Sequence, residues 1–355
     1  MTAQPQVREA LAIGIAGRLP VALFGGPGVG KTSMVEQLGA AHGMHVEVIV
    51  LAQSEPTDLT GVPYVDDTGS TRSAVPDWVH RVNQSSPSLV FLDEFTQASP
   101  LHQGVCNDII QSRRVAGVAL AEHVHFVAGY NPPEVCGGFD LSMPTRNRFI
   151  HIEVNPDPDA VAEGLLLGWP EAPHIDFVDL ERHVRHWKTT VAAFVKARPG
   201  VLEPPSPTAT GPFATPRSLE LAALAAAYAD AARRSADVRN LLIQGAIGAG
   251  AGLELSNYAA ELDLPDPARA LADPDGVTLP ERPDRAWAAL QSIADHAVRR
   301  GDLVSWRAAW RLAGRVACAS GADVAAMAAR QLVVHQPPGA TPPDEVAVFR
   351  DLLAA

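Results

Sequence analysis

Cysteine, basic residues and long apolar runs are scarce in this 355-residue sequence, and each shortage excludes a class of protein. The three cysteines, Cys106, Cys136 and Cys318, lie far apart and form no C-x-x-C pair, which excludes a disulfide-stapled fold and favours a reducing, cytoplasmic location. No apolar stretch approaches the ~18 residues that a bilayer span needs, so no membrane helix is expected. The N-terminus has neither the basic nor the apolar region of a secretory signal.

Acidic residues outnumber basic ones by 40 to 28, which gives a formal net charge of −12. A charge of this sign repels phosphate backbones, so it disfavours nucleic acid as a partner, although a local basic patch would still permit binding. Hydrophobic residues make up 47% of the chain and charged residues 19%, a composition typical of a protein with a sizeable core rather than of a disordered chain. The length predicts two or three domains.

Short apolar runs alternate with helical patterns in the first part of the chain; the runs are residues 21–24, 45–51, 88–92, 124–128 and 149–154. Strands that alternate with helices predict a parallel sheet covered on both faces, because parallel strands need crossover connections. From residue 155 onward only helical patterns remain, interrupted by proline-rich segments. The sequence therefore predicts an α/β core over residues 1–154, a helical segment over 155–275 and a C-terminal helical domain over 276–355.

A glycine-rich stretch, Gly25-Gly-Pro-Gly-Val-Gly-Lys-Thr32, fits the pattern G-x-x-x-x-G-K-[ST] and lies between a predicted strand and a predicted helix. Glycines let backbone N–H groups turn inward around a phosphate chain, and the start of the helix adds a positive dipole. Lys31 would reach the β- and γ-phosphates, and the Thr32 hydroxyl would ligate Mg²⁺. The predicted nucleotide contacts are Gly25, Gly26, Pro27, Gly28, Val29, Gly30, Lys31, Thr32 and Ser33.

Two adjacent carboxylates, Asp93 and Glu94, follow the apolar run at 88–92. Asp93 would hold Mg²⁺ together with Thr32, and Glu94 would polarise the water that attacks the γ-phosphate. A GTPase would need a guanine-reading N-K-x-D segment, and the sequence has none. A small-molecule kinase would need a lid and a substrate site, which the sequence does not indicate.

With these two motifs, residues 7–230 resemble an AAA+ ATPase, and specifically the MoxR and dynein-related bacterial branch. Residues 25–32 and the pair Asp93-Glu94 match its Walker A and Walker B motifs, and residues 110–115 resemble the end of the helix that follows the acid pair. Residues 53–63 resemble the stretch before the family's pore-side insert. The resemblance implies a P-loop α/β core followed by an α-helical lid, and hydrolysis of ATP with Mg²⁺.

The resemblance also assigns roles to polar residues outside the two motifs. Asn131 stands where the family carries its sensor 1 residue, which positions the lytic water. Arg146 and Arg148 end the helix that presents an arginine finger to the adjacent subunit, and the sequence does not decide between them. Arg217 stands at the sensor 2 position, at the start of a lid helix. The candidate catalytic residues are thus Glu94, Asn131, Arg146, Arg148 and Arg217.

An arginine supplied by a neighbouring subunit implies a homo-oligomer, and the resemblance implies a hexameric ring. It further implies a chaperone-like remodeller of a partner protein, working alongside a von Willebrand factor A protein. Two alternatives stay open. One is a nucleic-acid-directed motor of the same superfamily, and the other is an ATP-binding assembly scaffold that does not need hydrolysis.

Overall fold

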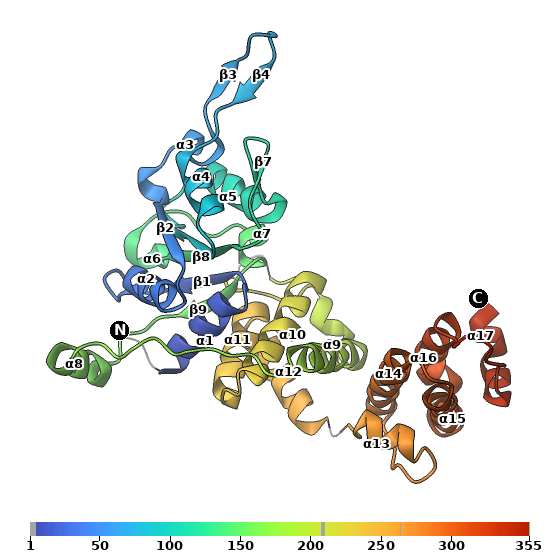
Figure 1. Ribbon diagram of the computed structural model, residues 1–355. Coiled ribbons are helices and arrows are strands. Elements are labelled where there is room, and N and C mark those ends of the chain that lie inside the picture. The colour runs from blue at the N-terminus through green and yellow to red at the C-terminus, as the bar shows by residue number, and fades with distance from the viewer. Residues whose placement is uncertain (1–4, 207–209, 263, 355) are drawn as a thin grey trace. The chain divides into compact units, whose positions relative to one another are not determined.

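The computed structural model describes residues 5–206, 210–262 and 264–354 (Figure 1). The chain forms two compact units, the first comprising Met1–Leu180 and Pro204–Leu253 and the second Glu181–Glu203 and Glu254–Ala355. These boundaries differ from residues 154 and 275, and the three-part division made from the sequence stays a prediction. Within the described part of the chain, no helix combines the length and the apolar character that a membrane crossing requires.

The first unit contains one large sheet, two hairpins and most of the helices. Its large sheet consists of β1 (Val21–Phe24), β2 (His45–Val50), β5 (Ser88–Asp93), β8 (Val124–Tyr130) and β9 (Ile150–Glu153). Its hairpins are β3 (Pro63–Val65) with β4 (Thr71–Ser73), and β6 (Arg114–Val115) with β7 (Val118–Ala119). Its helices are α1 (Pro5–Ala16), α2 (Lys31–Ala41), η1 (Leu51–Gln53), α3 (Pro56–Thr60), α4 (Asp77–Gln84), α5 (Pro100–Ser112), α6 (Pro133–Cys136), α7 (Met143–Arg146), α8 (Pro158–Leu167), α10 (Pro216–Ala231) and α11 (Ala236–Ile247).

The large sheet has the strand order β2-β5-β8-β1-β9, and every strand runs parallel to its neighbours. Each strand falls on one of the five apolar runs, so the predicted parallel α/β sheet is confirmed. Because the strands are parallel, all of their C-terminal ends meet at one edge of the sheet. The glycine-rich loop and the acid pair both follow strands at this edge.

Helices cover both faces of this sheet, as side-chain alternation along buried strands requires. Leu92 of β5 packs in one apolar cluster with Trp78 of α4 and Ile109 of α5. Leu89, three residues earlier, lies on the opposite face against Gly39 of α2. Helix α11 packs against β9 and α1. The sheet is therefore the middle layer of the first unit, and only its edges are free to carry polar groups.

The β3–β4 hairpin projects away from the sheet (Figure 1). Its turn is fixed by the carboxylate of Asp66, which accepts hydrogen bonds from the backbone of Thr68 and Ser70 and from Arg72 Nε at 2.9 Å. These bonds, led by that from the Thr68 hydroxyl, lower the pKa of Asp66 to about 2. The turn is thus ordered by polar contacts while the strands of the hairpin stay exposed to solvent.

The second unit is helical. Its elements are α9 (Leu180–Ala197), η2 (Pro199–Leu202), α12 (Ala249–Glu261), α13 (Pro267–Ala272), α14 (Pro283–Arg300), α15 (Leu303–Ser320), α16 (Ala322–Val334), η3 (Asp344–Phe349) and α17 (Arg350–Ala354). The first residue of α9 and the first five residues of α12 still belong to the first unit. The rings of Trp306 and Trp310 of α15 lie edge to face with centroids 6.1 Å apart, and Trp310 also packs on Phe349. Phe177 lies before α9 and packs edge to face on Tyr228 of α10, and both residues belong to the first unit.

Candidate functional site

The glycine-rich loop connects the end of β1 to the start of α2, as predicted. Gly28 and Gly30 have φ angles of 75° and 90°, in the left-handed region that side chains with a Cβ rarely adopt. Gly25 needs its hydrogen for a different reason: a Cβ there would lie 2.3 Å from the carbonyl oxygen of Val154, just after β9. The glycines therefore give the loop a shape that no other residue type would maintain.

The side chain of Lys31 lies over this loop and is buried. Its ammonium donates to the carbonyl oxygens of Gly25 and Gly26, both at 3.0 Å, and to Oδ1 of Asn131 at 2.7 Å. Burial lowers the pKa of Lys31, and the nearby carboxylate of Asp93 opposes that shift. A cation held above a ring of backbone groups fits the terminal phosphates of a nucleotide. The structure thus joins the phosphate-loop lysine to the predicted sensor 1 asparagine.

Thr32 and Asp93, the two predicted Mg²⁺ ligands, lie side by side. The Thr32 hydroxyl donates to Oδ2 of Asp93 at 2.7 Å, and the other carboxylate oxygen, Oδ1, accepts from the backbone N–H of Glu94 at 2.8 Å. A hydroxyl and a carboxylate are hard oxygen donors of the kind that Mg²⁺ prefers beside phosphates. The pair therefore fits a magnesium ion at the end of the glycine-rich loop.

Glu94 has a φ of 56°, so its backbone is left-handed although the residue is not glycine. Such a conformation costs an L-residue roughly 1–2 kcal/mol, and non-glycine residues that adopt it are concentrated at functional sites. The turn it produces lets Asp93 and Glu94 leave the strand at the same edge of the sheet. A turn of this kind is compatible with two consecutive carboxylates facing one site, which stays a prediction.

Two residues of this edge were missed by sequence reasoning. The hydroxyl of Thr96, which is 1% exposed, donates to the backbone oxygen of Asn131 at 2.7 Å and so fixes the sensor segment. Gly129 lies in β8, where a Cβ would be 2.6 Å from Phe91 and 2.8 Å from Oδ1 of Asp93. A glycine inside a strand often indicates close approach of another group, and this was the signal available in the sequence.

Replacing Gly129 with alanine is expected to displace the Asp93 carboxylate from Thr32. Groups that orient metal ligands typically contribute roughly 10- to 100-fold in metal affinity or activity, so a loss of that size in turnover at limiting Mg²⁺ is expected. The measurement is ATPase rate against Mg²⁺ concentration. Gly104→Ala is the matched control, because a Cβ at Gly104 of α5 meets no atom within 4 Å. Equal Mg²⁺ curves for the two variants would contradict the argument.

The structure does not bring Arg148 to the glycine-rich loop of the same chain. Ile150 at the start of β9 pairs with Val21 at the start of β1, whereas the loop begins beyond the other end of β1. The four residue steps from Val21 to Gly25, at about 3.3 Å each, separate the two edges of the sheet by about 13 Å. An arginine side chain does not reach that far. Arg148 instead donates to the carbonyl oxygen of Pro144 and to Oε1 of Gln111, near the end of α5.

Arg217, at the start of α10, lies beside Arg148. Burial lowers the pKa of Arg148, and the positive charge of Arg217 lowers it further. The Thr215 hydroxyl at the N-terminus of α10 hydrogen bonds to the Asn147 side chain at 2.8 and 3.0 Å, which ties this helix to the end of α7. Two of the three predicted arginines therefore share the edge of the sheet opposite to the phosphate loop.

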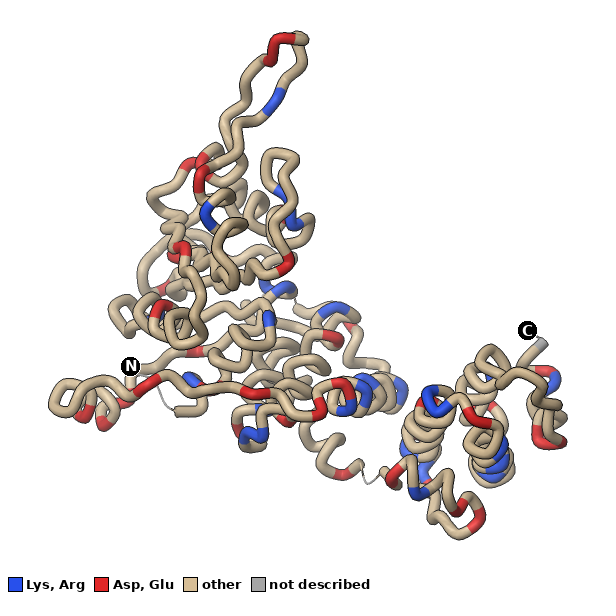
Figure 2. The backbone as a smooth tube through the Cα atoms, viewed as in Figure 1, with Lys and Arg blue, Asp and Glu red and all other residues tan. Residues whose placement is uncertain are grey.

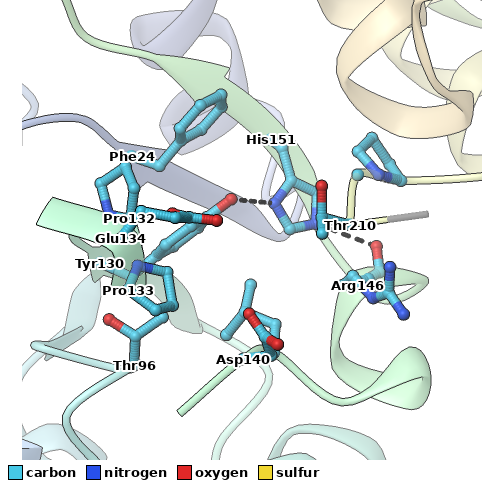
Figure 3. A pocket seen from close by; sticks show the side chains of 13 residues that line it. Phe24, Thr96, Tyr130, Pro132, Pro133, Glu134, Asp140, Arg146, His151 and Thr210 are labelled. Atoms are coloured by element: carbon cyan, nitrogen blue, oxygen red, sulfur yellow. Dashed lines mark hydrogen bonds between the residues drawn. The ribbon is translucent and has the colours of Figure 1, made fainter. Parts of the chain in front are cut away.

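Arg146 lies elsewhere, on the wall of a pocket of about 460 Å³ within the first unit (Figure 3). Phe24 and Tyr130, which end β1 and β8 and stack at 5.4 Å between ring centroids, also line this pocket. Its wall includes the buried His151 of β9. Arg146 and Arg148 are thus two residues apart in the chain but occupy different surroundings.

Comparison with known proteins gives one family match. Residues 20–149 match the model of the AAA domain of the dynein-related subfamily, a range that contains the glycine-rich loop, the acid pair and Asn131, Arg146 and Arg148 but ends before Arg217. No curated protein matches the chain.

Among solved structures, the crystal structure of "a putative ATPase" from Cytophaga hutchinsonii is similar at 14% identity over 75% of this chain and 92% of that one, with a TM-score of 0.49. A full-length MCM homolog from Methanopyrus kandleri is similar at 19% identity over 68% of this chain and 56% of that one, with a TM-score of 0.41. At these levels neither adds to the family match. That match and the parallel sheet with its glycine-rich loop identify residues 20–149 as the AAA domain of an AAA+ ATPase of the dynein-related type.

Proposed function

We propose that this protein is a ring-forming AAA+ ATPase of MoxR type that hydrolyses ATP with Mg²⁺ and uses the energy to remodel a partner protein. The observation that carries the proposal is the division of the polar residues between two opposite edges of one sheet. The phosphate loop, the acid pair and Asn131 lie at one edge, and Arg148 and Arg217 lie at the other. A site divided in this way is complete only between two copies of the chain.

At the first edge, each residue has a role that its contacts support. Thr32 and Asp93 would hold Mg²⁺, which neutralises charge on the β- and γ-phosphates when bound. Lys31 would bind the same phosphates from the loop. Glu94 would orient the attacking water, and Asn131, held by Thr96 and already in contact with Lys31, would position that water against the γ-phosphate. These residues bind and align the substrate but supply no mobile positive charge for the transition state.

Arg148 would supply that charge to the neighbouring subunit. It is partly exposed and lies at the edge remote from its own phosphate loop. Arg217 would act with it, since the two guanidinium groups repel each other and a shared phosphate would relieve that repulsion. Arg146 is the weaker candidate, because it lines the pocket beside His151. This choice between Arg146 and Arg148 was not available from the sequence.

A head-to-tail contact of this kind closes into a ring when the rotation between subunits allows it. Six subunits is the number that the resemblance implies. The partner class it implies is a von Willebrand factor A protein, and the scarcity of cysteine fits a cytoplasmic location.

The projecting β3–β4 hairpin favours a protein partner over nucleic acid. Its apolar side chains Val62, Tyr64 and Val65 are 59%, 51% and 71% exposed. Its charged residues are Asp66, Asp67 and a single Arg72 that is paired with Asp66, and Figure 2 shows acidic residues at the tip of the hairpin and a basic one farther down. A surface that is apolar and slightly acidic suits an exposed polypeptide and repels a phosphate backbone.

The proposal is tested by ATPase turnover in the presence of casein, as an unfolded polypeptide, or of single-stranded DNA. Casein is expected to raise turnover of the wild-type protein, and Tyr64→Ala is expected to remove that increase while leaving basal turnover unchanged. Thr71→Ala, an exposed change on the paired strand, is the control. Stimulation by DNA and not by casein would favour the nucleic-acid motor and refute the protein remodeller.

A further inference from the structure

A buried histidine joins the end of β8 to the end of α7. His151, the second residue of β9, is 5% exposed and lies between Tyr130 and Arg146 (Figure 3). Its Nδ1 is 2.8 Å from the hydroxyl oxygen of Tyr130, and its Nε2 is 2.9 Å from the carbonyl oxygen of Arg146. Tyr130 ends β8 and Arg146 ends α7, so one imidazole joins two segments that are separate in the chain.

The direction of both hydrogen bonds follows from their partners. A carbonyl oxygen can only accept, so Nε2 of His151 carries the proton and donates to Arg146. Burial lowers the pKa of His151 to about 4, which leaves the ring neutral at physiological pH and its Nδ1 an acceptor. The Tyr130 hydroxyl therefore donates to Nδ1. Both hydrogen bonds therefore point the same way, because Tyr130 donates to His151 and His151 donates to the carbonyl oxygen of Arg146. We call this pair of hydrogen bonds the bridge.

Each end of the bridge is next to a residue of the divided site. Tyr130 directly precedes Asn131, which contacts Lys31 at 2.7 Å. At the other end, Arg146 is two residues before Arg148. Carbonyl groups in the last turn of a helix lack partners inside the helix, and the imidazole supplies one to α7. A shift of the sensor segment would therefore pull on the end of α7 through two hydrogen bonds.

We propose that His151 is a positioning residue that couples the nucleotide contact at Asn131 in one subunit to the orientation of the Arg148 that the same subunit presents to its neighbour. The inference depends on the proposed function, because it needs Arg148 to act across a subunit boundary. It adds to that function a route by which the occupancy of one site sets the activity of the next.

Three variants test the bridge. His151→Phe removes both hydrogen bonds and keeps a ring, Tyr130→Phe removes only the first bond, and His151→Gln keeps an N–H donor for the Arg146 carbonyl. In His151→Phe we expect kcat to fall roughly ten-fold through misplacement of a catalytic group. KM for ATP should change by less than about two-fold, because the phosphate loop is untouched. Tyr130→Phe should likewise lower kcat with little change in KM, and His151→Gln should recover part of the loss in kcat.

A second experiment tells coupling through His151 apart from a purely structural role of this residue. Rings are assembled from intact subunits and an increasing fraction of Lys31→Ala subunits, which cannot bind ATP. In otherwise wild-type rings, turnover should fall more steeply than the fraction of intact subunits, since each empty subunit also misdirects its Arg148. When every subunit also carries His151→Phe, or Tyr130→Phe if the first variant fails to fold, the fall should become proportional to that fraction. A merely destabilised protein would lower the unfolding temperature and keep the steep curve.

If turnover falls with the fraction of Lys31→Ala subunits in the same way with and without the bridge, the coupling role of His151 is wrong, and the proposed function is not affected. The outcome is distinguished from failure of the proposed function by mixing Glu94→Gln with Arg148→Ala subunits. If that mixture regains no turnover, Arg148 does not act in trans, and the proposed function and the coupling fall together. If it does regain turnover and the fall with Lys31→Ala subunits is still the same with and without the bridge, only the role of His151 is wrong.

Discussion

Glu94→Gln is expected to bind ATP as the wild-type protein does and to hydrolyse it roughly 10²- to 10⁴-fold more slowly, the usual contribution of a group that takes or directs a proton in the transition state. The amide keeps the size of the side chain but cannot accept a proton from water. Because Lys31, Thr32 and Asp93 are unchanged, the nucleotide and Mg²⁺ should still bind. The measurements are turnover, binding of a fluorescent ATP analogue, and native mass with ATP, which should show a ring trapped in its ATP-loaded state.

The matched control is Glu36→Gln, the same chemical change on an exposed position of α2. It should leave turnover and binding unchanged. Wild-type turnover in Glu94→Gln would contradict the role given to this carboxylate. The same variant separates the remodeller from the assembly scaffold, since a scaffold would keep its effect on the partner protein after hydrolysis is lost, whereas a remodeller would lose it.

Mixing Glu94→Gln with Arg148→Ala is expected to restore activity that neither variant has alone. In a mixed ring, an Arg148→Ala subunit keeps its phosphate loop and acid pair and can receive an intact arginine from a Glu94→Gln neighbour. For random mixing at equal amounts, one contact in four has this arrangement, so turnover should reach at most about a quarter of the wild-type rate. The measurement is turnover before and after subunits are exchanged.

The control for the mixture replaces Arg148→Ala with Arg146→Ala. This substitution keeps the backbone carbonyl that His151 contacts and removes only the guanidinium in the pocket. Recovery of activity with Arg146→Ala and not with Arg148→Ala would show that the finger has been assigned to the wrong residue. No recovery with either would refute the divided site.

The strands and the phosphate loop could be predicted because their signals are local. A run of apolar residues bounded by glycines or acids indicates a buried strand wherever it occurs, and the spacing from Gly25 to Thr32 specifies a loop without reference to the rest of the chain. The acid pair at the end of β5 was predicted for the same reason. The direct contact of Thr32 with Asp93 follows once both strands end at one edge of the sheet.

What could not be predicted depends on pairs of residues far apart in the chain. The placement of Arg217 beside Arg148 requires the hydrogen bonds between Thr215 and Asn147, 68 residues apart, and no periodicity encodes them. The bridge from Tyr130 through His151 requires the order of β8, β1 and β9 in the sheet.

The left-handed backbone at Glu94 has a consequence for engineering. Glycine at this position would release the conformational penalty, and asparagine would reduce it, so either change would be favoured by a screen that rewards survival at high temperature. Both changes delete the carboxylate. Directed evolution for heat resistance, without a parallel selection for catalysis, would therefore favour a more stable protein that no longer hydrolyses ATP.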